Sequence, residues 1–344
     1  TTASNNTAVG YQALTANTTG TRNTAVGTSA GAAVTTGGNN TVMGYNALAT
    51  NTVGDRNVAI GEGALQTHNP SSNADTYNVA VGYDAGNAVT TGVQNTLIGG
   101  LAGDALTEAD ANVAIGKGAL TTDTLGSSSV AVGNNALTNQ NFTSATDTYN
   151  VAVGKNAGLS MTTGTENTFV GGLAGDAATT ASGTTFVGKS AGSATTTGGD
   201  NTGLGKQALK STTTGIANTA VGKDALEANT TASNNTAVGF KSLEANTTGT
   251  ENTAVGTNAL DANTTANYNT AVGYNSLTAN TTGTTNSGFG AYTLAANTTA
   301  NDNTALGYSA MGSTTTGATN TGVGRSALGA NTTGHTNVAV GALA

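Results

Sequence analysis

One short string recurs along the whole chain at an almost constant spacing, and this repeat limits what the chain can fold into. The string is Asn-Thr-Ala-Val-Gly or a close variant, and its twenty copies start 17 residues apart except for two intervals of 21. A 17-residue unit is too short for two packed helices, because helical repeats are about 33 to 47 residues long. Each copy is therefore expected to form one small unit that contacts only its neighbours along the chain. The copies begin at Asn6, Asn23, Asn40, Asn57, Asn78, Asn95, Asn112, Ser129, Asn150, Asn167, Thr184, Asn201, Asn218, Asn235, Asn252, Asn269, Asn286, Asn303, Asn320 and Asn337.

The residues of each copy predict one turn of a β-structure. The consensus is N-T-A-V-G-x-x-A-L-x-x-N-T-T-G-x-x, in which Thr and Val favour strands while Gly and Asn occupy fixed turn positions. Positions two and four of a copy share one side of the strand, and position three faces the other way. Because position four is apolar in every copy, we expect positions two and four to form the core and position three, usually Ala, to face outward.

We therefore expect an all-β fold, a parallel β-solenoid of about twenty 17-residue coils, in one continuous array over residues 1–344. In such a stack identical side chains lie above one another, so first-position Asn side chains can bond amide to amide along the axis. The fifth-position Gly is expected where φ is positive or where no Cβ fits. The ladder residues singled out on these grounds are Asn6, Gly10, Asn23, Gly27, Asn235, Gly239, Asn252 and Gly256.

A longer repeat is superimposed on the short one. Residues 57–128 and 129–200 are offset by 72, which is four copies plus an insertion of four residues. Duplication of a block of four coils explains this offset. The first six residues match an interior repeat junction at 230–235, the chain stops eight residues into its last copy, and neither end has the polar cap that solenoids need. We expect the chain to be a slice of a longer polypeptide, or a unit that stacks end to end.

The expected outward column of small residues leaves two interpretations open. Ala8 and its equivalents can form a close-packed seam between chains, or they can simply tolerate solvent. Larger residues at the same position, Leu97, Phe169 and Phe186, favour burial. An apolar column exposed along a whole stack would also be a liability, which favours a partner surface.

Two variants of the repeat resemble known fibre proteins. Residues 57–61, 112–116 and 337–341, which read Asn-Val-Ala-Ile-Gly twice and Asn-Val-Ala-Val-Gly, resemble the head repeat of YadA-like trimeric autotransporter adhesins. Residues 6–22, with N-T-A-V-G-Y-x-A-L followed by N-T-T-G, are even more similar to repeat regions of phage tail-fibre proteins. The resemblance implies a left-handed parallel β-roll, often a homotrimer, that displays or spaces a binding tip. The period of 17 departs from the shorter adhesin coil, which leaves the cross-section and the trimeric state open.

These features predict a structural fibre shaft of an extracellular, cell-surface or virion appendage. Its expected partner is the chain itself, as a homotrimer or by end-to-end assembly, with a host-surface glycan or protein as a further candidate. The alternative is a bacterial surface adhesin or self-assembling extracellular filament that contacts its ligand directly. A more remote alternative is an ice-binding solenoid, which needs two outward Thr columns. The N-T-T-G corner supplies only one, because adjacent residues face opposite ways.

Composition argues against several other classes. Only 8% of the residues are charged, the formal net charge is −8, and Cys is absent, so there is no basic stripe for nucleic acid and no thiolate for a metal. No apolar run reaches the roughly 20 residues needed for membrane insertion. The two histidines, His68 and His335, are expected as solvated corner residues, so no His-supported nucleophile is available. Glu108 and Asp110 lack the ligand number and spacing of a calcium loop. We expect no enzyme activity, no cofactor and no metal.

The two insertions are expected to bulge from the stack. They are the best candidates for contact points with a partner, although they can also be insertions that the fold merely tolerates. The candidate contact residues are His68, Asp75, Tyr77, Gln140, Asp147 and Tyr149.

Overall fold

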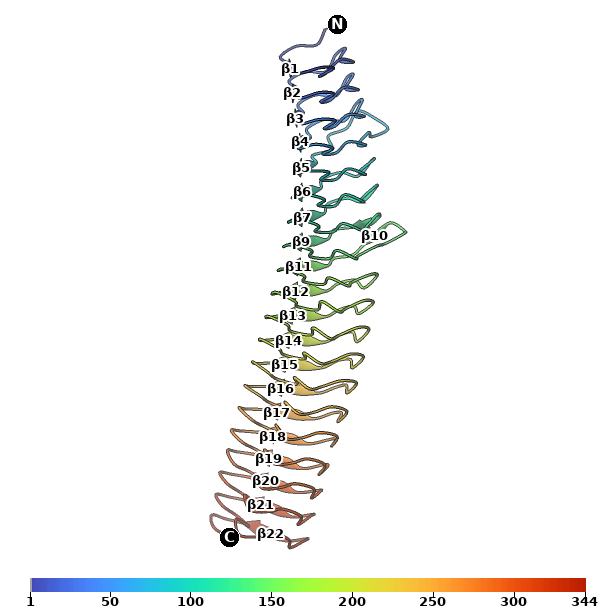
Figure 1. The fold of residues 1–344 in the computed structure, drawn as a ribbon. Helices are drawn as coiled ribbons and strands as arrows, with labels where there is room; N and C mark the ends of the chain where they lie inside the picture. Colours follow the sequence, from blue (N-terminus) through green and yellow to red (C-terminus); the bar gives the residue numbers. More distant parts are fainter. Residues whose placement is uncertain (1) are drawn as a thin grey trace. The chain divides into compact units, whose positions relative to one another are not determined.

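The computed structural model describes residues 2–344, which contain strands and turns but no helix. The chain forms two compact units, Thr1–Leu173 and Ala174–Ala344. Each unit is a stack of coils about 17 residues apart, with one three-residue strand per coil and parallel pairing between successive coils (Figure 1). The predicted all-β class and the parallel β-solenoid of about twenty coils are confirmed.

The strands occupy positions two to four of each copy. Two further strands of two residues, β8 and β10, pair with each other outside this series. The first unit contains β1 (Thr7–Val9), β2 (Thr24–Val26), β3 (Thr41–Met43), β4 (Val58–Ile60), β5 (Val79–Val81), β6 (Thr96–Ile98), β7 (Val113–Ile115), β8 (Gly126–Ser127), β9 (Val130–Val132), β10 (Thr146–Asp147), β11 (Val151–Val153) and β12 (Thr168–Val170). The second contains β13 (Thr185–Val187), β14 (Thr202–Leu204), β15 (Thr219–Val221), β16 (Thr236–Val238), β17 (Thr253–Val255), β18 (Thr270–Val272), β19 (Ser287–Phe289), β20 (Thr304–Leu306), β21 (Thr321–Val323) and β22 (Val338–Val340).

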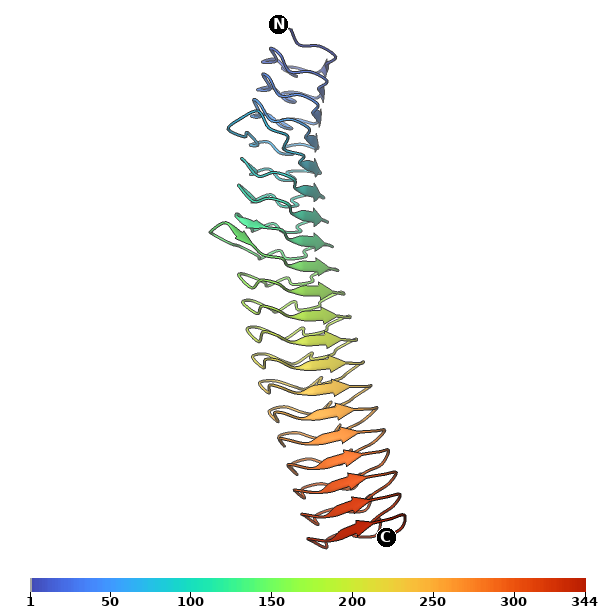
Figure 2. The same cartoon turned by 180° about the vertical axis from the view of Figure 1, so that it is seen from behind.

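Within each unit, equivalent positions of successive copies lie directly beside one another. In β15 and β16, for example, Thr219 pairs with Thr236 and Val221 with Val238. The register survives the first insertion, because β4 and β5 still pair at equivalent positions. The view from behind shows the strands of each unit as a column of parallel arrows (Figure 2). Every position of the repeat therefore becomes a column of side chains along its unit.

The interior of each unit lies on the side opposite to the expected one. Third-position side chains such as Ala220, Leu97 and Phe186 are fully buried, whereas the second- and fourth-position side chains of β3 and β20 are exposed. The predicted core at positions two and four is therefore wrong, and so is the predicted seam of Ala side chains between chains. The reason is the thickness of the coil: its interior accommodates a small third-position residue beside one Leu at position nine.

Positions three and nine compensate for each other in volume. Eight coils combine Ala at position three with Leu at position nine, as in Ala220 and Leu226, which are both fully buried. Where position three is bulky, position nine nearby is Gly. A Cβ on Gly158 would lie 2.9 Å from Cδ2 of Phe169, and one on Gly192 would overlap the Phe186 ring. Because cores are close-packed, the variation between Leu and Gly at position nine follows from what position three holds.

Main-chain conformation explains the invariant glycine. Gly239 has a φ of 138°, and a Cβ there would meet the carbonyl carbon of Gly256 in the next coil at 2.6 Å. Both halves of the expectation for position five are therefore confirmed. The buried Leu at position nine is also left-handed, with a φ of 51° at Leu226, and this was not predicted. A left-handed L-residue costs roughly 1–2 kcal/mol, which burial of the side chain offsets.

Asn side chains form the expected ladder at position one. The Oδ1 of Asn235 accepts the main-chain N–H of Asn252 at 2.9 Å and its Nδ2 at 3.2 Å. The same Nδ2 donates to the carbonyl of Ala266 at 2.8 Å, within its own coil. The amide bonding along the axis is thus confirmed. A second ladder, at position twelve, was not foreseen: Asn263 Nδ2 donates to Asn246 Oδ1 at 3.0 Å.

Candidate functional surfaces

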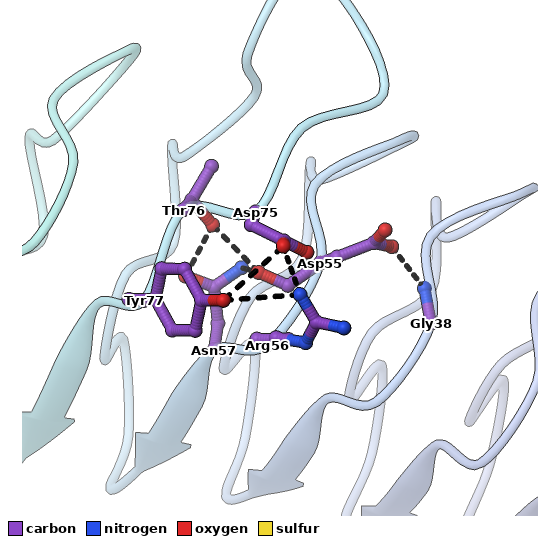
Figure 3. A network of polar contacts seen from close by, with 7 residues as sticks. All are labelled: Gly38, Asp55, Arg56, Asn57, Asp75, Thr76 and Tyr77. Atoms are coloured by element: carbon purple, nitrogen blue, oxygen red, sulfur yellow. Dashed lines mark hydrogen bonds and ion pairs between the residues drawn. The ribbon is translucent and has the colours of Figure 1, made fainter.

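The first insertion is held against the coil that precedes it. Arg56 forms an ion pair with Asp75, and its guanidinium lies 5.6 Å from the centre of the Tyr77 ring (Figure 3). Thr76 Oγ1 donates a hydrogen bond to Asn57 Oδ1 at 2.8 Å. Asp75 and Tyr77 are exposed, so both are accessible to a partner and their positions are fixed by the contact with Arg56.

The second insertion ends in the same Asp-Thr-Tyr-Asn sequence as the first but uses a different anchor. Its strand β10 pairs with β8, and Ser128 Oγ donates to Asp147 Oδ1 at 3.2 Å. Ser128 occupies the repeat position that Arg56 occupies before the first insertion, so Asp147 has no arginine partner there. Asp147 and Tyr149 are exposed, which keeps them as candidate contact residues.

The remaining two candidates are buried. Gln140 is fully enclosed, donates from Nε2 to Asp123 Oδ2 at 2.6 Å and accepts at Oε1 from Asn150 Nδ2 at 2.9 Å. His68 is 0% exposed, and neither ring nitrogen has a hydrogen-bond partner. The prediction of a solvated corner is therefore wrong for His68, because position twelve points into the coil. Burial lowers the pKa of His68 to about 4. Neither side chain can touch a partner in this arrangement.

The most uniform surface is the strand face, defined as the second- and fourth-position side chains of all coils in a unit. Position two holds only Thr, Val or Ser, and position four only Val, Ile, Leu, Met or Phe, so the strand face has no charged side chain in any coil. Its aliphatic column reaches the surface, with Val9 58% and Leu306 50% exposed. Within each unit a column of Thr and Val thus runs beside a column of larger apolar side chains.

Charged side chains gather on the loops instead. Among residues 2–344, Asp224, Glu227 and Glu244 form the group of acidic side chains close enough together to hold a metal ion. Each of them already faces a lysine, and the pKa of Lys241 is raised chiefly by its hydrogen bond with Glu244. The group therefore acts as a set of ion pairs, two of them within a coil and one, Lys210 with Glu227, between neighbouring coils. These pairs are Lys223 with Asp224 at 2.8 Å, Lys210 with Glu227 at 3.0 Å and Lys241 with Glu244 at 2.9 Å.

The other polar residues considered from the sequence have structural contacts. His335 is exposed, as expected, and its Nδ1 accepts the main-chain N–H of Ala318 at 3.0 Å. Asp110 Oδ1 accepts the N–H of Val93 at 2.7 Å, and Glu108 is exposed beside it. These contacts join neighbouring coils.

Comparison with known proteins adds no assignment. No protein-family model matches the chain, and no match was found among curated proteins. Residues 2–344 contain no helix that is long and apolar enough to cross a membrane. Any functional interpretation therefore depends on the surfaces of the coils.

Proposed function

We propose that the chain is a shaft segment of an extracellular or virion fibre, of the tail-fibre kind, in which three copies pack through their strand faces. The observation that carries this proposal is the strand face itself. Its fourth-position side chains point away from the interior in every coil that the structure describes, yet all of them are apolar. Such a surface is best explained by a partner that covers it.

The contacts between coils suit a shaft. Main-chain hydrogen bonds join each coil to the next, as between Thr236 and Asn252 at 2.9 Å, and the two Asn ladders add bonds in the buried interior. Because each coil is bonded to its neighbours at every side, bending or stretching a unit must break many such bonds together. This supports a role in which length and stiffness matter.

A second copy of the chain fits the strand face better than an unrelated partner. Only a partner with the same 17-residue period can keep its columns in register with this face over many coils. The absence of charge on the face removes like-charge repulsion between copies. Covering a half-exposed Val or Leu contributes on the order of 1 kcal/mol, so ten coils together can outweigh the entropic cost of association, estimated at about 4–15 kcal/mol.

Two alternatives place a different partner on the same surfaces. In a bacterial adhesin or self-assembling filament, the exposed side chains of the shaft would contact a ligand or the end of another copy. In an ice-binding solenoid, the strand face would order water. That face has one column rich in Thr beside an aliphatic column, which suits burial against protein better than hydrogen bonding to ice.

The test is the mass of the assembly in solution. Multi-angle light scattering on the intact chain is expected to give three chains per particle. The double variant carries Val238→Glu and Val272→Glu, two fourth-position changes in β16 and β18. It is expected to give single chains, because two new carboxylates from each of three chains would be brought into the packed faces.

The matched control places the same charge elsewhere on nearby coils. Thr278→Glu changes position ten, which already holds Glu227 and Glu244 in other coils, and it should leave the trimer intact. A wild-type chain that stays single at about 100 μM would refute the proposal, and polymers that the face variant does not disrupt would favour end-to-end assembly. Thermal hysteresis in the wild-type solution would favour ice binding.

A further inference from the structure

The strand face lies between two repeat positions that can carry charge. Position seventeen comes directly before the first-position residue and forms the N-side border of the face. Position six comes directly after the invariant Gly and forms the C-side border. In the coil of β14, for example, Asp200 lies two residues before the strand and Lys206 two residues after it, and both are exposed. The uncharged face thus has a charged side chain on each side.

The two borders differ in the sign of their charge. Six of the ten basic residues of the chain occupy position six, among them Lys189, Lys206 and Lys223. Position seventeen holds four acidic residues, among them Asp200 and Glu251, and two arginines. No copy of the repeat has charges of the same sign at both borders. Charge is therefore concentrated beside the face, and its sign distinguishes one border from the other.

Three lysines of the C-side border form a column beside β13, β14 and β15. The main-chain carbonyl of Lys189 accepts the N–H of Gln207 at 3.0 Å, and that of Lys206 accepts the N–H of Asp224 at 3.0 Å, so successive copies of position six lie side by side. All three lysines are exposed. Lys223 pairs with Asp224 at 2.8 Å, whereas Lys189 and Lys206 form no ion pair with any of residues 2–344. The lysine column therefore presents positive charge that its own chain leaves unpaired.

Asp200 is the acidic residue on the opposite border of the same coils. It precedes β14, which pairs with β13 on one side and β15 on the other. Asp200 also forms no ion pair with any of residues 2–344. The strand residues Thr202–Leu204 separate Asp200 from Lys206, so the two charges stay apart within one chain. Each of them is thus available to a partner that covers the strand face.

We propose that Asp200 of one copy pairs with the lysine column of the next copy, and that this contact makes the packed strand faces parallel. The inference rests on the proposed function, in which copies pack through these faces. Rotation about an axis parallel to the stack brings the C-side border of one copy beside the N-side border of the next. Antiparallel packing of the same faces would instead bring each border beside its own kind, and so lysine beside lysine, which is unfavourable.

The strand face cannot select the orientation by itself. Its apolar side chains recur in every coil and carry no charge, so parallel and antiparallel copies bury the same kinds of group. The borders do vary from coil to coil, and they can act as the charged e and g positions do in coiled coils, where they set partner orientation. Because the lysine column covers three successive coils, Asp200 meets a lysine of the next copy even when the copies are offset by one coil in either direction.

Glu251 provides a matched control on the same border. It is exposed, occupies position seventeen before β17 and forms no ion pair with any of residues 2–344. The copies of position six in its own coil and in the two adjacent coils are Phe240, Thr257 and Tyr274. A parallel neighbour therefore offers no lysine to Glu251, although the two acidic residues have equivalent places in the repeat.

The first test is chemical cross-linking of the intact chain. Isotopically heavy and light chains are mixed, allowed to assemble and treated with a carbodiimide, which joins a carboxylate to an amine in contact with it. Mass spectrometry is expected to find Asp200 joined to Lys189, Lys206 or Lys223 in peptides that combine one heavy and one light half. Asp200→Asn should abolish these mixed peptides, and Glu251 should form none.

The second test is the affinity of assembly, measured by light scattering on dilution. Asp200→Lys is expected to raise the concentration for half-assembly by about tenfold, through repulsion from the lysine column, while Glu251→Lys should leave it unchanged. Lys206→Glu should also weaken assembly, and combining it with Asp200→Lys should cost less than the sum of the two single losses. Both changes have precedents, because position seventeen holds Arg56 and position six holds Glu62.

The outcomes separate this inference from the proposed shaft. Mixed peptides at Asp200, together with coupling between the two borders, support the ion pair between copies. Particles of three chains that lack the mixed peptides would overturn the inference and leave the shaft in place, and so would equal effects of Asp200→Lys and Glu251→Lys. A wild-type chain that stays single would overturn both.

Discussion

Replacing His68 by Leu tests whether the interior of the coils is as dry as the packing indicates. The imidazole is fully buried with no hydrogen bond to either nitrogen, and burial lowers its pKa from 6.5 to about 4, opposed only in part by the main chain of Thr90. Leucine fits the site by precedent, because Val89 and Leu106 hold the same repeat position in the next two coils. The substitution thus removes the titrating group and keeps an apolar filling.

The sign and size of the pH effect follow from linkage. Below about pH 6.5 the unfolded chain gains a proton on His68, while the folded chain does not until about pH 4, so lowering the pH favours unfolding. Each pKa unit is worth about 1.4 kcal/mol. The wild-type coil should therefore lose up to about 3 kcal/mol on full acidification, and about 2 kcal/mol between pH 7.5 and pH 5. The loss is absent above pH 6.5 and complete below pH 4.

Amide hydrogen exchange gives the measurement coil by coil. Exchange of amides in the coils of β4 and β5 is followed at several pH values, in wild type and His68→Leu, after correction for the intrinsic rate. Acidic groups common to both proteins, including Asp55 and Asp75, cancel in the difference. The expected difference between the two proteins grows by about 2 kcal/mol toward pH 5. Equal pH dependence in wild type and His68→Leu would refute the idea that this histidine is buried and neutral.

Two further predictions concern the interior of the second unit, both measured by equilibrium unfolding. Phe186→Ala should cost about 3–5 kcal/mol through a cavity, and Gly192→Leu should also destabilise by overlap. The double variant restores the common Ala and Leu pair, so it should recover most of the loss; strict additivity would contradict the volume compensation. Gly239→Ala should cost about 2–4 kcal/mol through strain and its clash with Gly256. Gly312→Ala, which has no positive φ, is the control, and an equal effect of the two would refute the backbone argument.

The period of the repeat was enough to predict the fold, because few structures can be built from 17 residues per unit. The columns, the Asn ladder and the conformation of the fifth-position Gly followed from stacking alone. Which side of the strand is buried did not follow from stacking. Alternation separates the two sides of a strand but does not say which side is buried. The apolar residue at position four suggested the wrong side, because the thin core is filled by other positions of the repeat.

The signal that could have decided the question is the coupling between positions three and nine. Leu97 has Gly86 and Gly103 next to it, and Phe186 has Gly192, a pattern that makes sense only if both positions share one interior. Position one has the same parity as position three, so the recurrent Asn belongs to that interior too. The burial of His68 and Gln140 follows from position twelve, where Val89 and other apolar residues occur among the Asn.

The corrected side of the strand changes what the repeat says about function. Position four does not fill the core, so folding of a single coil places little demand on it. Positions that face solvent in the same way vary freely: position six holds Tyr11, Thr28 and Lys117. Position four nonetheless never accepts a polar residue in twenty coils. A restriction that the coil does not need for itself points to a constraint from outside the coil, and the proposed packing against a neighbouring copy with the same period would impose it at every step along the chain.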